Sequence, residues 1–270
     1  MPFDRDVLRE FDAELARVWH FILESIFENC VPYAKETKGG FLVSEIAGPG
    51  YELLTNEEDL LTFTMANQCD KAAHVLLPIV RKMFGDRGKR VRVSRVDVTP
   101  KRACIEFYRI NDSRARSHTF IQIMIGKEQL VIDPTKAQFG FQECGLWLRE
   151  FLKSYGVHHE NTNPRTFTWE EHQKEWESIA MLADGLAVEG EYDLRFSQCL
   201  GERLGEAYDA WRLRLGDELN AVEVLSRARE SRESFREAVT KVVDDVLKEK
   251  GKKVCRFPKK KSDDLVGEST

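Results

Sequence analysis

The segment from His118 to Asp133 sets the strongest limit on the fold, because its residues alternate as they do in a β-hairpin. Gly126 and Lys127 form a Gly-X pair, which is typical of a two-residue type II′ turn whose first central position needs a positive φ. This turn would pair Ile125 with Glu128 and place alternate residues on opposite faces. One face of the hairpin is then apolar and consists of Thr119, Ile121, Ile123, Ile125, Leu130 and Ile132.

The other face of the hairpin carries a histidine and an aspartate. In the register set by the turn, His118 and Asp133 are diagonal neighbours about 7–8 Å apart at the backbone, within reach of a hydrogen bond. Such a carboxylate would orient the imidazole and stabilise its protonated form, which leaves the second ring nitrogen for a nucleophile. The alternative is a strand-end histidine beside an aspartate that only opens an Asp-Pro turn.

The candidate nucleophile is Cys69, the first residue of an apolar helical pattern in which Pro78 predicts a kink or a division. The unpaired N–H groups and the dipole at a helix start favour a thiolate and could bind an oxyanion. His74 lies roughly 140° around the helix from Cys69, so it is not expected to act as the base. The alternative for Cys69 is an inert buried cysteine, which is also the expectation for Cys30, Cys104, Cys144, Cys199 and Cys255.

The order Cys69, His118, Asp133, with cysteine opening a helix and the other two on successive strands, resembles the papain-like and transglutaminase-like cysteine enzymes. The run Leu-Val-Ile-Asp-Pro-Thr-Lys-Ala-Gln-Phe from Leu130 to Phe139 is similar to a segment of that superfamily. The resemblance covers about residues 55–142. It implies that Cys69 is the nucleophile, that His118 is the general base and later acid, and that Asp133 orients the imidazole. It also implies a supporting position for Gln138.

The residues around Cys69 depart from this family pattern. Asn67 and Gln68 precede the cysteine and Asp70 follows it, where relatives often have glycine or tryptophan. An acidic neighbour opposes thiolate formation. Because no glutamine stands at a papain-like distance upstream, the oxyanion donors would be the Cys69 amide together with Asn67 or Gln68.

The remaining patterns predict an α+β fold in which a cysteine-bearing helix packs on an antiparallel sheet, as the resemblance also implies. The strands expected in that sheet are residues 91–98, residues 103–110 and the hairpin. Helices are expected at 4–29, 56–67, 69–85, 144–155, 169–183, 197–215 and 218–248, with a Thr55–Glu58 capping box opening the second. The predicted parts are an N-terminal helix and loop region (1–54), a papain-like catalytic core (55–142), a helical region packed on that core (143–250) and a basic, disordered tail (251–270).

The function that we expect is a thiol-dependent acyl transfer through a Cys69 thioester: an amide hydrolase, a deamidase, or an acyl or aminoacyl transferase. Its substrate would be a protein, a peptide or a small amide. The alternative is a non-catalytic helical interaction protein on an inactive papain-like core, with the charged stretch 169–248 as a partner-binding surface. Modification of RNA or an aminoacyl-tRNA has only the basic tail and the Arg114/Arg116 pair in its favour.

Composition limits the classes of partner, the cellular compartment and the cofactors that we expect for this chain. The net charge of −5 implies neither nucleic acid nor an anionic membrane as a partner. No apolar run reaches the length of a membrane span and no signal-like segment opens the chain, which predicts a cytoplasmic protein. The six cysteines form no C-x-x-C pair or zinc-finger spacing, so no metal or other cofactor is expected.

Overall fold

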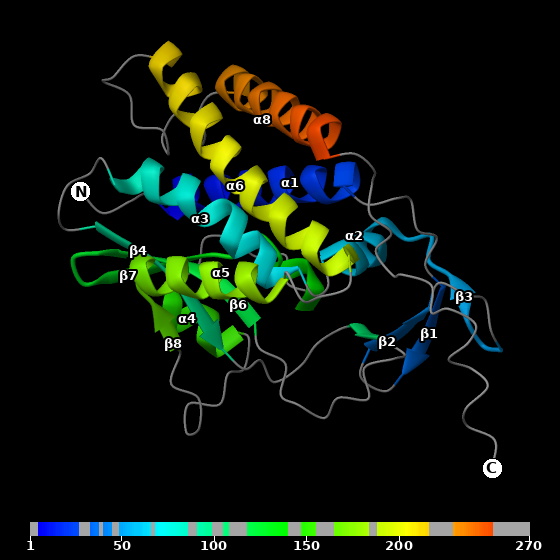
Figure 1. Ribbon diagram of the computed structural model, residues 1–270. Coiled ribbons are helices and arrows are strands. Elements are labelled where there is room, and N and C mark those ends of the chain that lie inside the picture. The colour runs from blue at the N-terminus through cyan, green and yellow to red at the C-terminus, as the bar shows by residue number, and fades with distance from the viewer. Residues whose placement is uncertain are drawn as a thin grey trace.

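The computed structural model describes residues 5–26, 33–37, 40–44, 49–65, 68–85, 91–98, 105–107, 118–139, 147–154, 165–183, 188–215 and 229–250 (Figure 1). The helices are α1 (Arg5–Ile26), α2 (Glu57–Met65), α3 (Cys69–Gly85), the 3-10 helix η1 (Lys136–Phe139), α4 (Leu148–Ser154), α5 (Trp169–Ala183), α6 (Val188–Leu215) and α8 (Arg229–Lys250). The strands are β1 (Tyr33–Thr37), β2 (Gly40–Ser44), β3 (Glu52–Leu53), β4 (Val91–Val98), β5 (Ile105–Phe107), β6 (His118–Ile125), β7 (Glu128–Ile132) and β8 (Arg165–Phe167). The fold is therefore α+β, as predicted.

The main sheet is antiparallel throughout and has the strand order β7-β6-β4-β8. Its β6–β7 hairpin has the predicted register, with Ile125 opposite Glu128 and Gln122 opposite Val131. Gly126 has a φ of 65°, the left-handed value that the first central position of the turn requires. The turn therefore decides which side chains share a face of the sheet.

The predicted membership of this sheet was wrong for the segment around residues 103–110. Its central part, β5, pairs in parallel with β2 and belongs to a second sheet of order β3-β1-β2-β5. A strand has only two edges for pairing, and both edges of β4 are occupied, by β6 and by β8. The strand β8, which sequence patterns did not predict, thus occupies the edge of β4 that β6 does not use.

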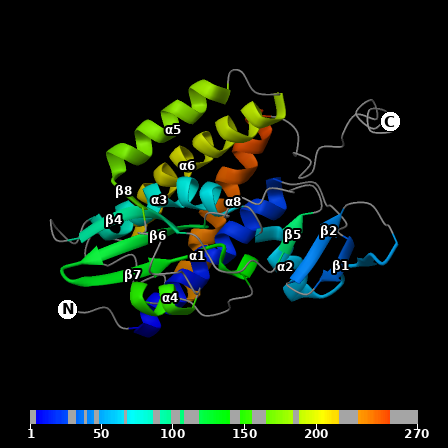
Figure 2. The same cartoon turned by 90° about the horizontal axis from the view of Figure 1, so that it is seen from below.

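The two faces of the main sheet are buried under different helices (Figures 1 and 2). Ile121, Ile123, Leu130 and Ile132 pack in one large core with the apolar residues of α1, α3, α6 and α8. On the other face, β4, β6 and β7 pack against α4 in a smaller core that consists of Val96, Val98, Phe120, Val131, Phe139, Phe151 and Leu152. The predicted division of the hairpin into two faces is confirmed.

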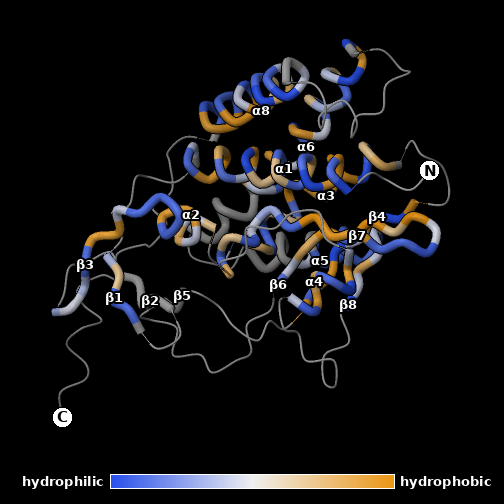
Figure 3. Tube along the Cα trace, turned by 180° about the vertical axis from the view of Figure 1, so that it is seen from behind, coloured by the Kyte–Doolittle hydropathy of each residue, from blue (hydrophilic) through white to orange (hydrophobic). Residues whose placement is uncertain are grey.

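The C-terminal helices belong to the large core. Figure 3 shows α8 with its hydrophilic side outward and its hydrophobic side towards the other helices. That side carries Phe235, Val239, Val243 and Val246, at the three- and four-residue spacing of an amphipathic helix. The apolar side of α8 is therefore buried against other helices of the same chain.

The structure differs from the helix predictions at the cap of α2, within α3 and at the start of α6. Asn56, and not the Thr55–Glu58 box, caps α2, because the Asn56 side-chain oxygen accepts the Glu58 N–H at 2.8 Å. The helix α3 runs past Pro78 without division. Helix α6 packs against α3 near Pro78, because a Cβ added at Gly201 of α6 would lie 3.5 Å from the backbone of Val75 in α3. The helix predicted for 197–215 begins earlier, at Val188.

Several expectations lie outside the described residues. These are the proposed oxyanion residue Asn67, the first part of the helix predicted for 218–248, the tail 251–270, and four of the cysteines (Cys30, Cys104, Cys144 and Cys255). The remaining cysteines, Cys69 and Cys199, are both free thiols.

Candidate active site

The structure brings His118 and Asp133 together at one end of the hairpin. His118 is the first residue of β6, and Asp133 directly follows β7. The Nε2 atom of His118 lies 2.8 Å from Oδ2 of Asp133, and both side chains are buried. The diagonal placement on one face of the hairpin accounts for this contact.

The carboxylate of Asp133 is held by the turn that follows it. Its second oxygen, Oδ1, accepts the N–H of Thr135 at 3.1 Å and the hydroxyl of Thr135 at 3.2 Å. This is the geometry of an Asx turn, in which an aspartate side chain bonds the backbone two residues on. Both oxygens of Asp133 are therefore engaged, one by the turn and one by the imidazole.

The backbone of the same turn is held by α1. The N–H of Asp133 donates to Oδ1 of Asp12 at 2.9 Å, and the ammonium of Lys136 lies 3.1 Å from Oδ2 of Asp12. Asp12 and Lys136 are both buried. Sequence reasoning missed both residues, although one signal was present: Asp12 interrupts the apolar stripe of α1 between Leu8 and Leu15.

Gln138 lies beside the second nitrogen of the imidazole. Its side-chain Nε2 donates to the hydroxyl of Thr135 at 3.0 Å and lies 3.3 Å from Nδ1 of His118. In the neutral ring, with its proton on Nε2, the Nδ1 lone pair can accept the Gln138 N–H. The structure thus places Gln138 at the site that the resemblance implies.

Cys69 is the first residue of α3 and is buried, with 7% of its surface exposed. Its thiol lies near enough to the imidazole of His118 to raise the pKa of that ring. Burial lowers the pKa of the imidazole, but the charge and hydrogen bond of Asp133 raise it more, and Cys69 adds to the rise. The balance raises the pKa of His118 to about 10. Charge on this ring is thus favoured by its partners and opposed by its burial.

Gln68 caps the helix that carries the cysteine. The carbonyl of Gln68 accepts the N–H of Ala72 at 2.8 Å, so Cys69 occupies the first helical position, where backbone N–H groups have no partner within the helix. The Gln68 side chain is buried, and its Oε1 atom has no hydrogen-bond partner among the described residues. The unpaired atom of Gln68 is thus a hydrogen-bond acceptor on the residue next to Cys69 in sequence.

Asp70, the acidic neighbour of Cys69, is bonded on the far side of β6 from His118. It accepts a hydrogen bond from the hydroxyl of Thr119. Because His118 and Thr119 are consecutive in a strand, their side chains leave opposite faces. The carboxylate of Asp70 is therefore directed to the face of the sheet that His118 does not occupy.

His74 belongs to a separate buried cluster between α3, β4 and α5. Its ring stacks on His172, with centroids 4.4 Å apart, and its Nε2 lies 3.2 Å from a guanidinium nitrogen of Arg95. Burial, His172 and Arg95 together lower the pKa of His74 to about 2. Burial and the arginines Arg95 and Arg81 lower the pKa of His172 to about 4. Both rings are neutral at pH 7, and His74 packs away from Cys69, as predicted.

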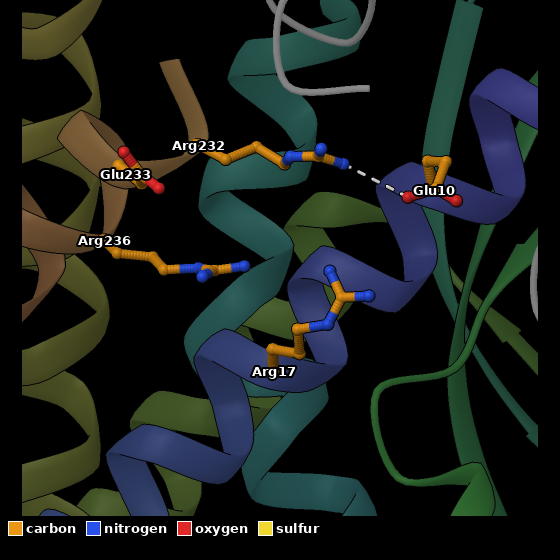
Figure 4. Close-up of a pocket in the computed structure, with 5 residues that line it drawn as sticks. All are labelled: Glu10, Arg17, Arg232, Glu233 and Arg236. Carbon is orange, nitrogen blue, oxygen red and sulfur yellow. Dashed lines mark hydrogen bonds and ion pairs between the residues drawn. The ribbon is translucent and has the colours of Figure 1, made fainter. Parts of the chain in front are cut away.

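A surface pocket of about 260 Å³ lies elsewhere, between α1 and α8 (Figure 4). Its lining residues are Glu10, Arg17, Arg232, Glu233 and Arg236, and none of the predicted site residues is among them. Arg232 pairs with Glu10 at 3.1 Å, while Arg236 forms two 2.5 Å hydrogen bonds to the buried Glu14. The charges of this pocket are thus largely matched within the chain.

Comparisons of the chain with protein-family models, with curated protein sequences and with solved structures gave no match. Within the described ranges, no helix has the length and apolar character needed to cross a membrane. No group of three or more histidine, cysteine or acidic side chains suited to a metal ion occurs in that part of the chain.

Proposed function

We propose that the chain is a cysteine-dependent acyl-transfer enzyme with a papain-like or transglutaminase-like core. The observation that supports this proposal best is the buried imidazole of His118, whose Nε2 atom lies 2.8 Å from Asp133 and whose pKa is raised by Asp133 and by the nearby thiol of Cys69. A carboxylate, an imidazole and a thiol in this order are the parts of a nucleophilic triad. The start of α3 supplies the helix N-terminus that favours a thiolate.

The reaction begins with proton transfer from the Cys69 sulfur to Nδ1 of His118, the ring nitrogen that Asp133 does not bind, and this nitrogen gives up its hydrogen bond from Gln138 to take the proton. The thiolate then forms a bond to the carbonyl carbon of an amide or ester, and the carbonyl π electrons move to its oxygen. When the tetrahedral intermediate collapses, the bond to the leaving amine or alcohol breaks and His118 returns its proton to that group. The product of this half is a thioester on Cys69.

The second half removes the acyl group. His118 takes a proton from water or from an amine, the resulting nucleophile attacks the thioester carbonyl, and the Cys69 sulfur leaves. Water gives hydrolysis or deamidation, and an amine gives transfer. The donors to the developing oxyanion would be the Cys69 backbone N–H and the side-chain amide of Gln68.

Alkylation with iodoacetamide near neutral pH tests the proposed thiol activation, with peptide mass spectrometry to locate the label. Cys199 is the internal reference, because it is also a free thiol and is more exposed than Cys69. We expect Cys69 to label about tenfold faster than Cys199 or more, and the His118→Asn variant to lose this advantage. Labelling of Cys69 no faster than Cys199 would contradict an activated thiol.

Intact-mass trapping tests the acyl-transfer step itself. Wild-type protein incubated with activated esters or with peptide libraries should gain the mass of an acyl group that hydroxylamine removes. The Cys69→Ala variant should gain none, and the Cys199→Ser variant should react as wild type does. An adduct that persists in Cys69→Ala would exclude Cys69 as its site.

A further inference from the structure

The start of α3 contacts the start of β6 on both faces of the strand. Two consecutive helix residues, Cys69 and Asp70, meet two consecutive strand residues, His118 and Thr119. Because neighbouring side chains in a strand point to opposite faces, the two contacts lie on opposite sides of β6. The first turn of the helix therefore straddles the strand end that carries the imidazole.

The contact on the Asp70 side is anchored in the sheet. Thr119 is 1% exposed, and its hydroxyl also lies 3.0 Å from Oδ1 of Asp97, which stands directly opposite it on β4. Asp97 is in turn 3.5 Å from the buried guanidinium of Arg95. The Thr119 hydroxyl is thus held between a strand partner and the residue that follows the thiol in sequence.

We propose that the Asp70–Thr119 hydrogen bond is a positioning clamp that sets the distance between the sulfur of Cys69 and the ring of His118. The inference rests on the proposed function and adds to it three positioning residues: Asp70, Thr119 and Asp97. None of them touches the reacting atoms. Because Cys69 and Asp70 share a rigid helical turn, fixing the carboxylate of one fixes the thiol of the other.

The hydroxyl of Thr119 lies between two carboxyl groups in this clamp. The hydroxyl of Thr119 has one proton and two carboxyl neighbours, so it can donate to only one of them. Burial raises the pKa of Asp97, Arg95 and Thr119 lower it, and the carboxylates of Asp70 and Glu175 raise it again, with a net upward shift. Asp70 and Asp97 are therefore the two acceptors within reach of this single hydroxyl proton.

The clamp also reassigns the role of the acidic neighbour. On sequence grounds Asp70 is an obstacle, because its charge opposes a thiolate at Cys69. In the structure its carboxylate accepts a hydrogen bond on the opposite side of the strand. Within the clamp, the oxygen acceptor of Asp70 holds the thiol in place and its negative charge is dispensable.

The test compares Thr119→Val, which removes the hydroxyl at nearly constant volume, with Thr119→Ser, which restores it. The matched control is Thr62→Val, a buried threonine of α2. We expect Thr119→Val to slow alkylation of Cys69 relative to Cys199 about tenfold or more, because small displacements of reacting groups are costly. Thr119→Ser and Thr62→Val should stay within about twofold of wild type. A uniform loss in all three variants would indicate general destabilisation and overturn the clamp.

A second readout separates the clamp from catalysis. Contact with Cys69 contributes to the upward pKa shift of His118, so loosening the contact should lower the pKa measured by NMR on the imidazole ring. Cys69→Ala and Thr119→Val should shift this titration in the same direction, whether or not the protein turns over a substrate. If Cys69→Ala shifts the titration and Thr119→Val does not, the clamp is wrong.

Asp70 variants distinguish an oxygen acceptor from a charge. Asp70→Asn keeps an oxygen acceptor for Thr119 and removes the charge, whereas Asp70→Leu removes both. We expect Asp70→Asn to react as wild type or faster, and Asp70→Leu to match Thr119→Val. Equal losses in both Asp70 variants would mean that the charge itself is needed, and this would overturn the proposed role. If Cys69 of the wild type labels no faster than Cys199, the proposed function is refuted. The clamp is then judged from the NMR titration of His118 alone.

Discussion

His118 is a buried residue whose charge state is set by opposing effects. Its complete burial opposes the imidazolium, and Asp133 favours it. The Gln138 amide, 3.3 Å from Nδ1, favours the neutral ring because an N–H donor needs the lone pair there. The ring thus has one partner that supports protonation and another that supports the unprotonated state.

The first prediction concerns the carboxylate of that pair. Asp133→Asn keeps an oxygen for the Thr135 turn but removes the charge, so burial dominates and the pKa of His118 should fall from about 10 to below its ordinary value of 6.5. NMR titration of the ring measures this change directly. Alkylation of Cys69 should slow about 100-fold, as for loss of an oriented base. An unchanged titration would contradict the assigned cause.

The same shift makes stability depend on pH. The folded pKa of His118 lies above its unfolded value, so the stabilisation it provides is complete below about pH 6.5 and is lost as the pH rises towards 10. The free energy of unfolding of wild type should therefore fall relative to Asp133→Asn across this window. Chemical denaturation at several pH values measures the difference.

At the scale of elements, α1 controls the turn that presents Asp133. Asp12 accepts from the Asp133 backbone and from Lys136, and all three groups are buried. A buried ion pair contributes little net stability, but removing one partner leaves an uncompensated charge. The N-terminal helix is therefore part of the candidate site, although it lies more than a hundred residues away in sequence.

The second prediction uses this pair. Asp12→Ala should lower the free energy of unfolding by about 3–5 kcal/mol, because it removes the buried carboxylate that Lys136 and the Asp133 N–H both contact. Lys136→Met added to Asp12→Ala should restore part of that loss, since no charge then remains buried. The Asp133 N–H still lacks its acceptor, so Cys69 alkylation should stay slow in the double variant. Strictly additive effects of the two substitutions on stability would contradict coupling between Asp12 and Lys136.

At the scale of the molecule, one core joins the hairpin to the C-terminal helices. The same cluster contains Ile121 of β6, Leu76 of α3, Leu204 of α6 and Val243 of α8. Trp211 and Phe235, which belong to the same cluster, pack with ring centroids 5.2 Å apart. The helix α3 carries Cys69 and packs in this core with α1, α6 and α8. The packing of these helices therefore fixes the position of the thiol.

The third prediction follows from that continuity. Phe235→Ala should cost about 3–5 kcal/mol through the cavity it leaves, and should lower the stability of the hairpin equally. Tryptophan fluorescence and the His118 ring signal should therefore report the same denaturant midpoint in wild type and in the variant. A His118 signal with an unchanged midpoint would mean that the hairpin unfolds independently of α8.

Short-range patterns were sufficient for much of the candidate site. Gly126 and the alternation around it predicted the register that joins His118 to Asp133, and the apolar helical pattern after Gln68 predicted a helix that begins at Cys69. Both depend on interactions within about twenty residues. A stretch of this length is long enough to show the apolar spacing of a helix or a strand, so these elements can be predicted from the sequence alone.

The tertiary structure alone decided which distant segments meet. It paired β8 with β4, brought Asp12 to a turn 121 residues away, and joined Asp70 to Thr119 across 49 residues. Single polar side chains such as these have no period by which a sequence could reveal their partners. Their pairing follows from how whole elements pack, because a buried polar group takes whichever partner the packed elements bring within hydrogen-bond distance.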